Sequence, residues 1–203
     1  MKIHILFGMI GFILLSGCNR AAEKNPRFYD AGVSRELAGH RKAQIKNLKY
    51  ELSFNIPRQK EAAIEGDITL RFDLASRQEV LIDFREEREK IKEVIANGVP
   101  VDKVRFENEH IILPASSTVE GANGIRIRFT AGNQSLNRND EYLYTLLVPD
   151  RARTVFPCFE QPNLKAEFTL QLELPADWKA VSNTYIRSET VTDDRKTVCF
   201  APT

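Results

Sequence analysis

A chain of 203 residues has room for one domain or for two small ones. Hydrophobic residues make up 42% and charged residues 28%, a globular composition that excludes disorder and collagen-like repeats. The net charge of +1 gives no basic excess that would favour nucleic acid, and three cysteines are too few for a disulfide-dense scaffold. With three His and three Cys, a four-ligand zinc site would need nearly all of them or carboxylates, which weakens the case for a self-contained metalloenzyme.

The first 17 residues are predicted to be a signal peptide. Lys2 precedes an apolar run from Ile3 to Leu15, which is shorter than the about 20 residues of a membrane-spanning helix. The run ends in Leu15-Ser16-Gly17-Cys18, which resembles a bacterial lipobox whose cysteine is acylated. This predicts a lipoprotein of the bacterial cell envelope, anchored to a membrane through Cys18 and facing the periplasm or the exterior. The alternative is a plain signal peptide in which Cys18 is incidental.

Residues 18–40 are predicted to be a polar tether, because they show no hydrophobic period and include Pro26 and Gly32. The charges of His40, Arg41 and Lys42 follow in a stretch that is compatible with a short helix. They are interpreted as a solvated face, with a membrane-surface role as the alternative.

From residue 41 to 203 the pattern predicts one all-β domain, an antiparallel sandwich or saddle-shaped sheet assembly. Apolar and polar residues alternate with the period of two that is typical of half-buried strands. The Asn97-Gly98 dipeptide favours a type I′ hairpin, and Gly121 to Gly124 is predicted to be a turn. The expected strands are 48–56, 64–74, 80–84, 91–95, 99–106, 110–113, 125–129, 166–174 and a last run beginning at 198.

The sequence contains no Gly-x-Ser-x-Gly elbow, no phosphate-binding glycine-rich loop and no His-Glu-x-x-His. His40 and His110 stand far apart and are interpreted as surface or hydrogen-bonded strand residues. Cys158 and Cys199 are compatible with a disulfide and equally with two buried thiols. No catalytic residues and no metal ligands are therefore predicted in this chain.

One segment between two predicted strands breaks the alternating pattern. It contains Phe156-Pro157-Cys158-Phe159-Glu160-Gln161-Pro162, where the prolines force an extended connection. Arg151 and Arg153 lie near Asp150 and Glu160, with which they can form charge-assisted hydrogen bonds. Such a rigid charged loop is either a structural staple or the wall of a site.

These seven residues, followed by Lys165-Ala166 and Phe168, resemble the Phe-Pro-Cys-Phe-Asp-Glu-Pro…Lys-Ala-x-Phe signature of the aminopeptidase N family (peptidase family M1) of zinc metallopeptidases. The resemblance covers the chain from about residue 48 to its end, including Trp178 and Ser182-Asn183. The arrangement from Tyr142 to Arg153 resembles that of bacterial envelope-associated members of the family. It implies an N-terminal β domain whose signature loop, Phe156 to Pro162, faces a catalytic domain.

The resemblance has two local departures. Glu160 stands where the family usually has Asp, which keeps the charge and adds a methylene. Eight residues before Phe156, many members have a Gln or Glu that binds the α-ammonium group of the substrate, whereas this chain has Val148. No ammonium-binding residue is therefore carried over.

The resemblance also implies a longer protein than this chain. In the family, zinc and its catalytic residues belong to a following domain, so the resemblance implies no cofactor in this chain and zinc only in the missing domain. The expected function is that of the non-catalytic N-terminal domain of a zinc aminopeptidase, inactive alone and incomplete at its C-terminal end. Its partners would be the absent catalytic domain of the same polypeptide and, through the lipid, a membrane. Peptide substrate would bind only to the full-length protein, and no nucleic acid is expected to bind. The alternatives are a peptide- or protein-binding β domain without enzymatic activity and a purely structural envelope lipoprotein.

The segment from Tyr142 to Pro162 is rich in apolar residues, which marks either an interaction surface or core. The resemblance favours a mixture of the two. Phe156 and Phe159 are predicted to be buried, and Tyr144, Leu147 and Val148 are predicted to contact the partner domain.

Overall fold

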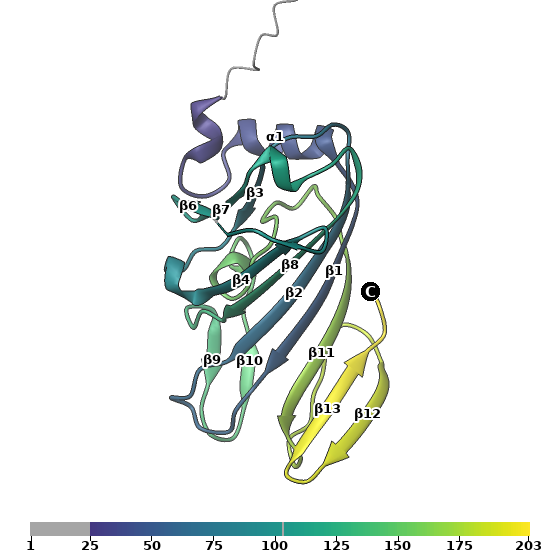
Figure 1. Ribbon diagram of the computed structural model, residues 1–203. Helices are drawn as coiled ribbons and strands as arrows, with labels where there is room; N and C mark the ends of the chain where they lie inside the picture. Colours follow the sequence, from purple (N-terminus) through teal and green to yellow (C-terminus); the bar gives the residue numbers. More distant parts are fainter. Residues whose placement is uncertain (1–24, 103) are drawn as a thin grey trace, which may run out of the picture.

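The computed structural model describes residues 25–102 and 104–203, so the predicted signal peptide and Cys18 lie outside the described residues. Figure 1 shows α1 at one end of a set of long strands and the β12–β13 hairpin at the other. The helical segments are η1 Pro26–Tyr29, α1 Arg35–Gln44, η2 Arg88–Lys90, η3 Ala115–Ser117 and η4 Ala152–Thr154. The strands are β1 Ile45–Asn55, β2 Glu65–Leu74, β3 Val80–Asp83, β4 Ile91–Ala96, β5 Val99–Pro100, β6 Arg105–Glu107, β7 His110–Leu113, β8 Gly121–Thr130, β9 Leu136–Arg138, β10 Leu143–Thr145, β11 Glu167–Pro175, β12 Ile186–Thr192 and β13 Arg195–Phe200.

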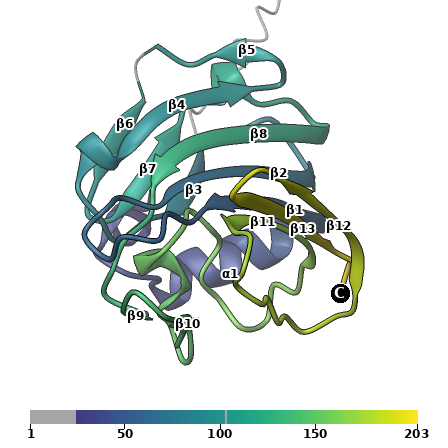
Figure 2. The ribbon, with the colours of Figure 1, turned by 90° about the horizontal axis from the view of Figure 1, so that it is seen from below.

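The described strands form three sheets. The largest has eight strands in the order β12-β13-β11-β1-β2-β8-β4-β5, and Figure 2 shows β4, β8, β2 and β1 following one another across it. The second has the order β3-β7-β6, and the third is the β9–β10 ribbon. The predicted all-β class is confirmed, as is the antiparallel pairing of β1 with β2. One pair differs from the antiparallel expectation, because β1 and β11 run parallel.

The core lies between the large sheet and the β3-β7-β6 sheet. Burial alternates along β2 and β8 because successive side chains of a strand point to opposite faces. Ile68 on β2 and Ile127 on β8 are fully buried, as are Ile82 on β3 and Ile111 on β7. The period of two read from the sequence therefore identifies the inward face of these strands.

Two predicted turns have different outcomes. Asn97 and Gly98 have φ values of 52° and 80° and join β4 to β5, which confirms the hairpin. Residues 121–124, by contrast, are the first residues of β8 and not a turn. The chain bends just before them, where the Asn123 side chain accepts a hydrogen bond from the Val119 N–H and donates to the Val119 carbonyl.

The segment up to residue 40 also differs from its prediction, because residues 25–40 belong to the folded domain instead of a tether. Ser34 caps α1 by accepting a hydrogen bond from the Leu37 N–H at 3.1 Å. Leu37 is only 1% exposed and packs against Leu81 and Ile112. A single buried leucine in a helix of ten residues is too weak a signal to be recognised as amphipathic, which is why the sequence pattern predicted a polar linker.

Three strands were not expected. β9 and β10 have three residues each, which is too short for an alternating pattern to emerge. β12 is exposed along its whole length, so its sequence carries no buried face to recognise. It pairs with β13 through backbone hydrogen bonds at the edge of the large sheet.

Candidate functional site

The signature loop, Phe156 to Pro162, lies between η4 and β11 and is attached to β3. The backbones of Asp83 and Cys158 exchange two hydrogen bonds, of 2.8 and 3.0 Å, which extend the β3 edge by one isolated bridge. Phe156, Cys158 and Phe159 are 3–5% exposed, and Pro162 is exposed. Phe156 and Phe159 are therefore buried as expected, and they pack inside this domain.

Asp83 is the centre of a buried polar network. It is fully buried, and its carboxylate accepts from the Arg41 guanidinium at 2.6 and 2.7 Å and from the Glu160 N–H at 2.8 Å. His110 Nδ1 lies 2.8 Å from the same carboxylate, and its Nε2 lies 2.9 Å from the Asp30 carbonyl. Burial opposes ionisation of Asp83, but the Arg41 charge and the hydrogen bonds from His110 and Arg41 outweigh it and lower the pKa to about 2.

This network joins α1 to the signature loop. Arg41, only 3% exposed, also donates to the Leu81 carbonyl and lies over the Phe159 ring at 5.2 Å. The Gln161 side chain donates to the Ala38 carbonyl of α1 at 3.1 Å. Arg41 is therefore not part of a solvated face, because an arginine this buried needs a carboxylate partner inside the fold. His110, in contrast, is the hydrogen-bonded strand histidine that was expected.

Glu160 and Arg153 hold the other side of the loop. The Glu160 carboxylate accepts from the backbone N–H of Arg153 at 2.7 Å, and burial raises its pKa. The Arg153 side chain pairs with Glu109 and, at 3.3 Å, with Asp150. The Arg153–Asp150 pair was expected from the sequence, whereas Glu109 was not.

The buried nucleophilic and phenolic groups of this region are not poised for catalysis. Burial raises the pKa of the Cys158 thiol well above its ordinary value, as do the charges of Glu160 and Asp83. Burial also raises the pKa of Tyr50, whose hydroxyl accepts from the Phe159 N–H at 2.8 Å. Cys158 and Cys199 are both free thiols, so the disulfide alternative is not realised in this structure. The arrangement holds a loop in place and offers no activated nucleophile.

Within residues 25–102 and 104–203 no group of three or more His, Cys, Asp or Glu side chains is placed to hold a metal ion. The buried candidates already have partners: Asp83 binds Arg41 and His110, and the Cys158 thiol stays protonated. These residues do not fit a metal centre.

Two of the three residues predicted to contact a partner domain line a large apolar groove of about 720 Å³. Tyr144 and Val148 are 49% and 84% exposed, and Leu147 is half-buried against the core. Tyr144 and Leu147 line the groove together with Phe54, Leu172 and Trp178. The groove has the size of a ligand pocket, and it was not visible in the sequence because its walls come from strands far apart in the chain.

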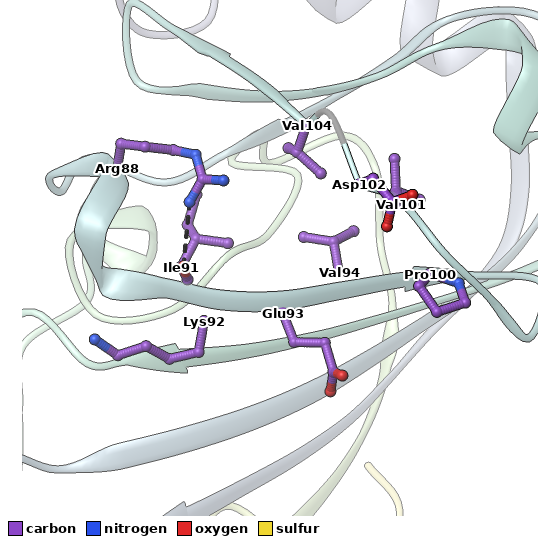
Figure 3. Close-up of a pocket in the computed structure, with 9 residues that line it drawn as sticks. All are labelled: Arg88, Ile91, Lys92, Glu93, Val94, Pro100, Val101, Asp102 and Val104. Carbon is purple, nitrogen blue, oxygen red and sulfur yellow. Dashed lines mark hydrogen bonds between the residues drawn. The ribbon is translucent and has the colours of Figure 1, made fainter.

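A second, smaller cavity of about 270 Å³ lies beside β4. Figure 3 shows Val94 and Val104 on one side of this strand and the Lys92 and Glu93 side chains on the other. Arg88 at its rim donates to the Ile91 carbonyl at 3.2 Å. Its charged groups are exposed and spread around an open rim, so the cavity offers no convergent chemistry.

Residues 46–203 match the family model of the peptidase M1 N-terminal domain. Aminopeptidase N of Streptomyces lividans is 32% identical over 165 residues, which are 74% of this chain and 19% of that protein. An M1 zinc metallopeptidase from Deinococcus radiodurans superposes with a TM-score of 0.65 at 20% identity, over 77% of this chain and 38% of that one. Native yeast LTA4 hydrolase gives a TM-score of 0.63 at 18% identity, over 78% of this chain and 27% of that one. The chain thus spans about a fifth of the length of the first curated relative and under two fifths of these structures.

Proposed function

The chain belongs to the peptidase M1 N-terminal domain family, and from this premise we propose that it is the non-catalytic N-terminal domain of a zinc-dependent aminopeptidase. The observation that carries the proposal is the family match over residues 46–203, joined to a relative that is named an aminopeptidase and is much longer than this chain. In this proposal the domain shapes the substrate cleft, and removal of N-terminal residues from peptides takes place in a following catalytic domain. Zinc would be held by that domain.

In this proposal, the buried network around Asp83 holds the signature loop in position for the catalytic domain. Arg41, Asp83 and Glu160 hold the signature loop against α1 and β3, so the surface beside the loop is rigid before any partner arrives. We place the catalytic domain against this surface, with Tyr144, Leu147 and Val148 at the contact. Val148 cannot accept a hydrogen bond from a peptide ammonium group, so this function would fall to other residues of the complete enzyme.

We also propose that the protein is a lipoprotein of the bacterial envelope, anchored through Cys18. The support is the lipobox-like sequence after the apolar run. None of the helices in the described part of the chain has the length and apolar character needed to cross a bilayer. An acylated N-terminus would supply membrane affinity of about 0.8 kcal/mol per buried methylene.

The test of the proposed function is to read the gene beyond codon 203, express the longer product and measure its zinc content and its hydrolysis of aminoacyl reporter substrates. One zinc per chain and release of the N-terminal residue would support the proposal. A stop after codon 203, together with a stable short product, would refute it and favour the alternative of a binding module. The apolar groove is the feature that such a module would use.

A further inference from the structure

The imidazole ring of His110 is enclosed between two hydrogen-bond acceptors. The residue is fully buried on β7, and its Nδ1 lies 2.8 Å from the Asp83 carboxylate. On the other side of the ring, Nε2 lies 2.9 Å from the backbone carbonyl of Asp30. A carbonyl oxygen can only accept a hydrogen bond, so Nε2 must donate the bond to Asp30. Nδ1 must donate as well if the Asp83 carboxylate is ionised.

The Asp83 carboxylate has no proton to offer to His110. Its oxygens accept from both terminal nitrogens of Arg41, at 2.6 and 2.7 Å, and from the Glu160 N–H at 2.8 Å. Burial opposes its ionisation, but Arg41 and His110 outweigh burial and lower the pKa to about 2, so Asp83 is charged at neutral pH. Both ring nitrogens of His110 therefore face acceptors, and only the doubly protonated imidazolium can donate to both. In the neutral ring one nitrogen lone pair would face an oxygen lone pair in a buried site, which is costly.

Charged groups stand around this ring on every element that packs against it. Arg41 of α1 opposes a second positive charge, because it shares the Asp83 carboxylate with His110. The Cys158 thiol stays protonated and so carries no charge. The remaining groups are Glu107, which pairs with His110 across β6 and β7, Glu109 next to it, Glu160 in the signature loop, the exposed side chain of Asp30, and Arg85 and Arg153, which both pair with Glu109. The carboxylates among them favour a positively charged ring.

His110 joins two segments that are far apart in the chain. The first is the arm, which we define as residues 25–34, the segment that leads into α1. Phe28 and Tyr29 of the arm pack against the buried side chains Leu37, Leu81 and Ile112. The Asn108 side chain donates to the Tyr29 carbonyl at 2.8 Å, and His110 holds the next carbonyl, that of Asp30. The second segment is the signature loop, which shares the Asp83 carboxylate with His110 through the Glu160 N–H.

We propose that His110 is a buried imidazolium at neutral pH and that its second proton is a pH-sensitive lock, which fastens the arm to β7 and, through Asp83, to the signature loop. When the proton is lost, it leaves Nε2 for the solvent, because Nδ1 stays beside the ionised Asp83. Nε2 then presents a lone pair to the Asp30 carbonyl, and the arm loosens at this point. The lock lies within this domain, so it stands whether or not the domain serves an aminopeptidase.

The sign of the pH effect follows from the number of protons bound. An ordinary imidazole, such as that of the unfolded chain, loses its second proton at about pH 6.5. Above that pH the folded protein binds one proton more than the unfolded chain, so its stability falls as pH rises until His110 is itself deprotonated. The folding equilibrium constant should fall about tenfold per pH unit in this window. The effect of Asp83 is opposite in sign and is confined to acid, because its pKa is about 2.

The direct test is NMR of the ¹⁵N-labelled 203-residue protein, in which the ring nitrogens of each histidine are examined for attached protons. About one pH unit above the ordinary imidazole value, we expect both nitrogens of His110 to carry a proton. His40 serves as the internal control, because it is partly exposed and one of its nitrogens bonds the Gln78 side chain at 2.7 Å. It should carry one ring proton at that pH. A single ring proton on His110 under the same conditions would overturn the proposal.

Hydrogen exchange tests whether the proton holds the arm. The amides of residues 25–34, Phe28 among them, are followed from neutral to alkaline pH, with rates corrected for the intrinsic pH dependence of exchange. We expect protection of the arm to fall several-fold as His110 deprotonates, both in the unmodified protein and in the matched control His40→Gln. His110→Gln has a side chain that cannot gain a proton, so its arm should exchange fast at every pH.

A merely structural role for His110 would lower the protection in His110→Gln without any pH dependence in the unmodified protein. Arm protection that does not change with pH in the unmodified protein would therefore overturn the lock, even if the ring carries two protons. Equal pH dependence in His110→Gln would overturn it as well. If His110→Gln does not fold, the ring protons and the pH dependence of the unmodified protein still decide the outcome.

Discussion

Replacing Asp83 by asparagine removes one charge from the centre of the buried network while keeping the size of the side chain. The partner, Arg41, is 3% exposed and would keep its charge without a counter-ion. The amide NH₂ would also face donors, since the Asp83 carboxylate accepts only from N–H groups of Arg41, His110 and Glu160. Removing one partner of a buried pair costs about 3–5 kcal/mol, so we expect Asp83→Asn to lower the free energy of unfolding by this amount.

The measurement is thermal and urea unfolding of purified protein, with Asp67→Asn as the matched control. For a domain of this size the expected loss corresponds to a fall in Tm of about 6–20 °C, at about 2–4 °C per kcal/mol. Asp67 also pairs with an arginine through both oxygens, but on the surface, where its own exposure is 28% and that of Arg126 is 51%. We expect the control to lose about 0–1 kcal/mol, as exposed ion pairs do.

A second substitution tests the stated cause. If an uncompensated Arg41 charge is what destabilises Asp83→Asn, then adding Arg41→Met should restore part of the lost stability, because the two effects are coupled. The reasoning would be refuted if Asp83→Asn lost no more stability than Asp67→Asn. It would also be refuted if Arg41→Met added its own full cost on top of the first.

Further expectations concern pH, the anchor, the chemistry and the surface. The pKa of Asp83 is about 2 in the fold against 3.8 ordinarily, so about 2–3 kcal/mol of stability should be present above pH 3.8 and lost as pH falls through 2. An acid titration of unfolding checks this, and Asp83→Asn should lack that component. Cys18→Ala should abolish membrane association and lipid labelling while the β domain stays folded, and a variant that still labels would contradict the lipobox assignment. The purified 203-residue product should hold no stoichiometric zinc and hydrolyse no aminoacyl reporter, which metal analysis and enzyme assays would show. Leu147→Ser should lower the Tm and Val148→Ser should not, because Leu147 is half-buried and Val148 is 84% exposed; equal shifts would argue against this division.

The strands that could be predicted are those with one face in the core. Ile68 and Leu70 on β2 alternate with polar residues, and their burial follows directly from that alternation. The signature loop could be recognised from Phe156 to Pro162, and its rigidity from its prolines. β12 could not be predicted, because a strand held at a sheet edge by backbone hydrogen bonds carries no pattern in its side chains.

The buried network around Asp83 could not be predicted from the sequence, for a different reason. Arg41, Asp83 and Glu160 are far apart in the chain. Arg41 stands between two other basic residues, Asp83 ends a short strand and Glu160 lies in an irregular loop, so no spacing links them. One signal was available, since Asp83 lies within the otherwise apolar run Val80 to Phe84. A carboxylate in such a run is costly unless a cation reaches it, and Leu37 and Arg41, four residues apart, mark the face of α1 that does so.

The parallel pairing of β1 with β11 dictates the order in which this domain can be completed. Lys49 and its partner Glu167 are separated by 118 residues, which a ribosome adds in about 6–24 seconds. During that interval β1 can pair with β2 on one side, while its other edge has no strand to bind. Open strand edges invite pairing with other chains, so the newly made protein passes through a period of vulnerability at what becomes the middle of its largest sheet. A strand made early therefore depends on a strand made much later, and the large sheet closes at its centre only after the 118 residues from Lys49 to Glu167 have been added.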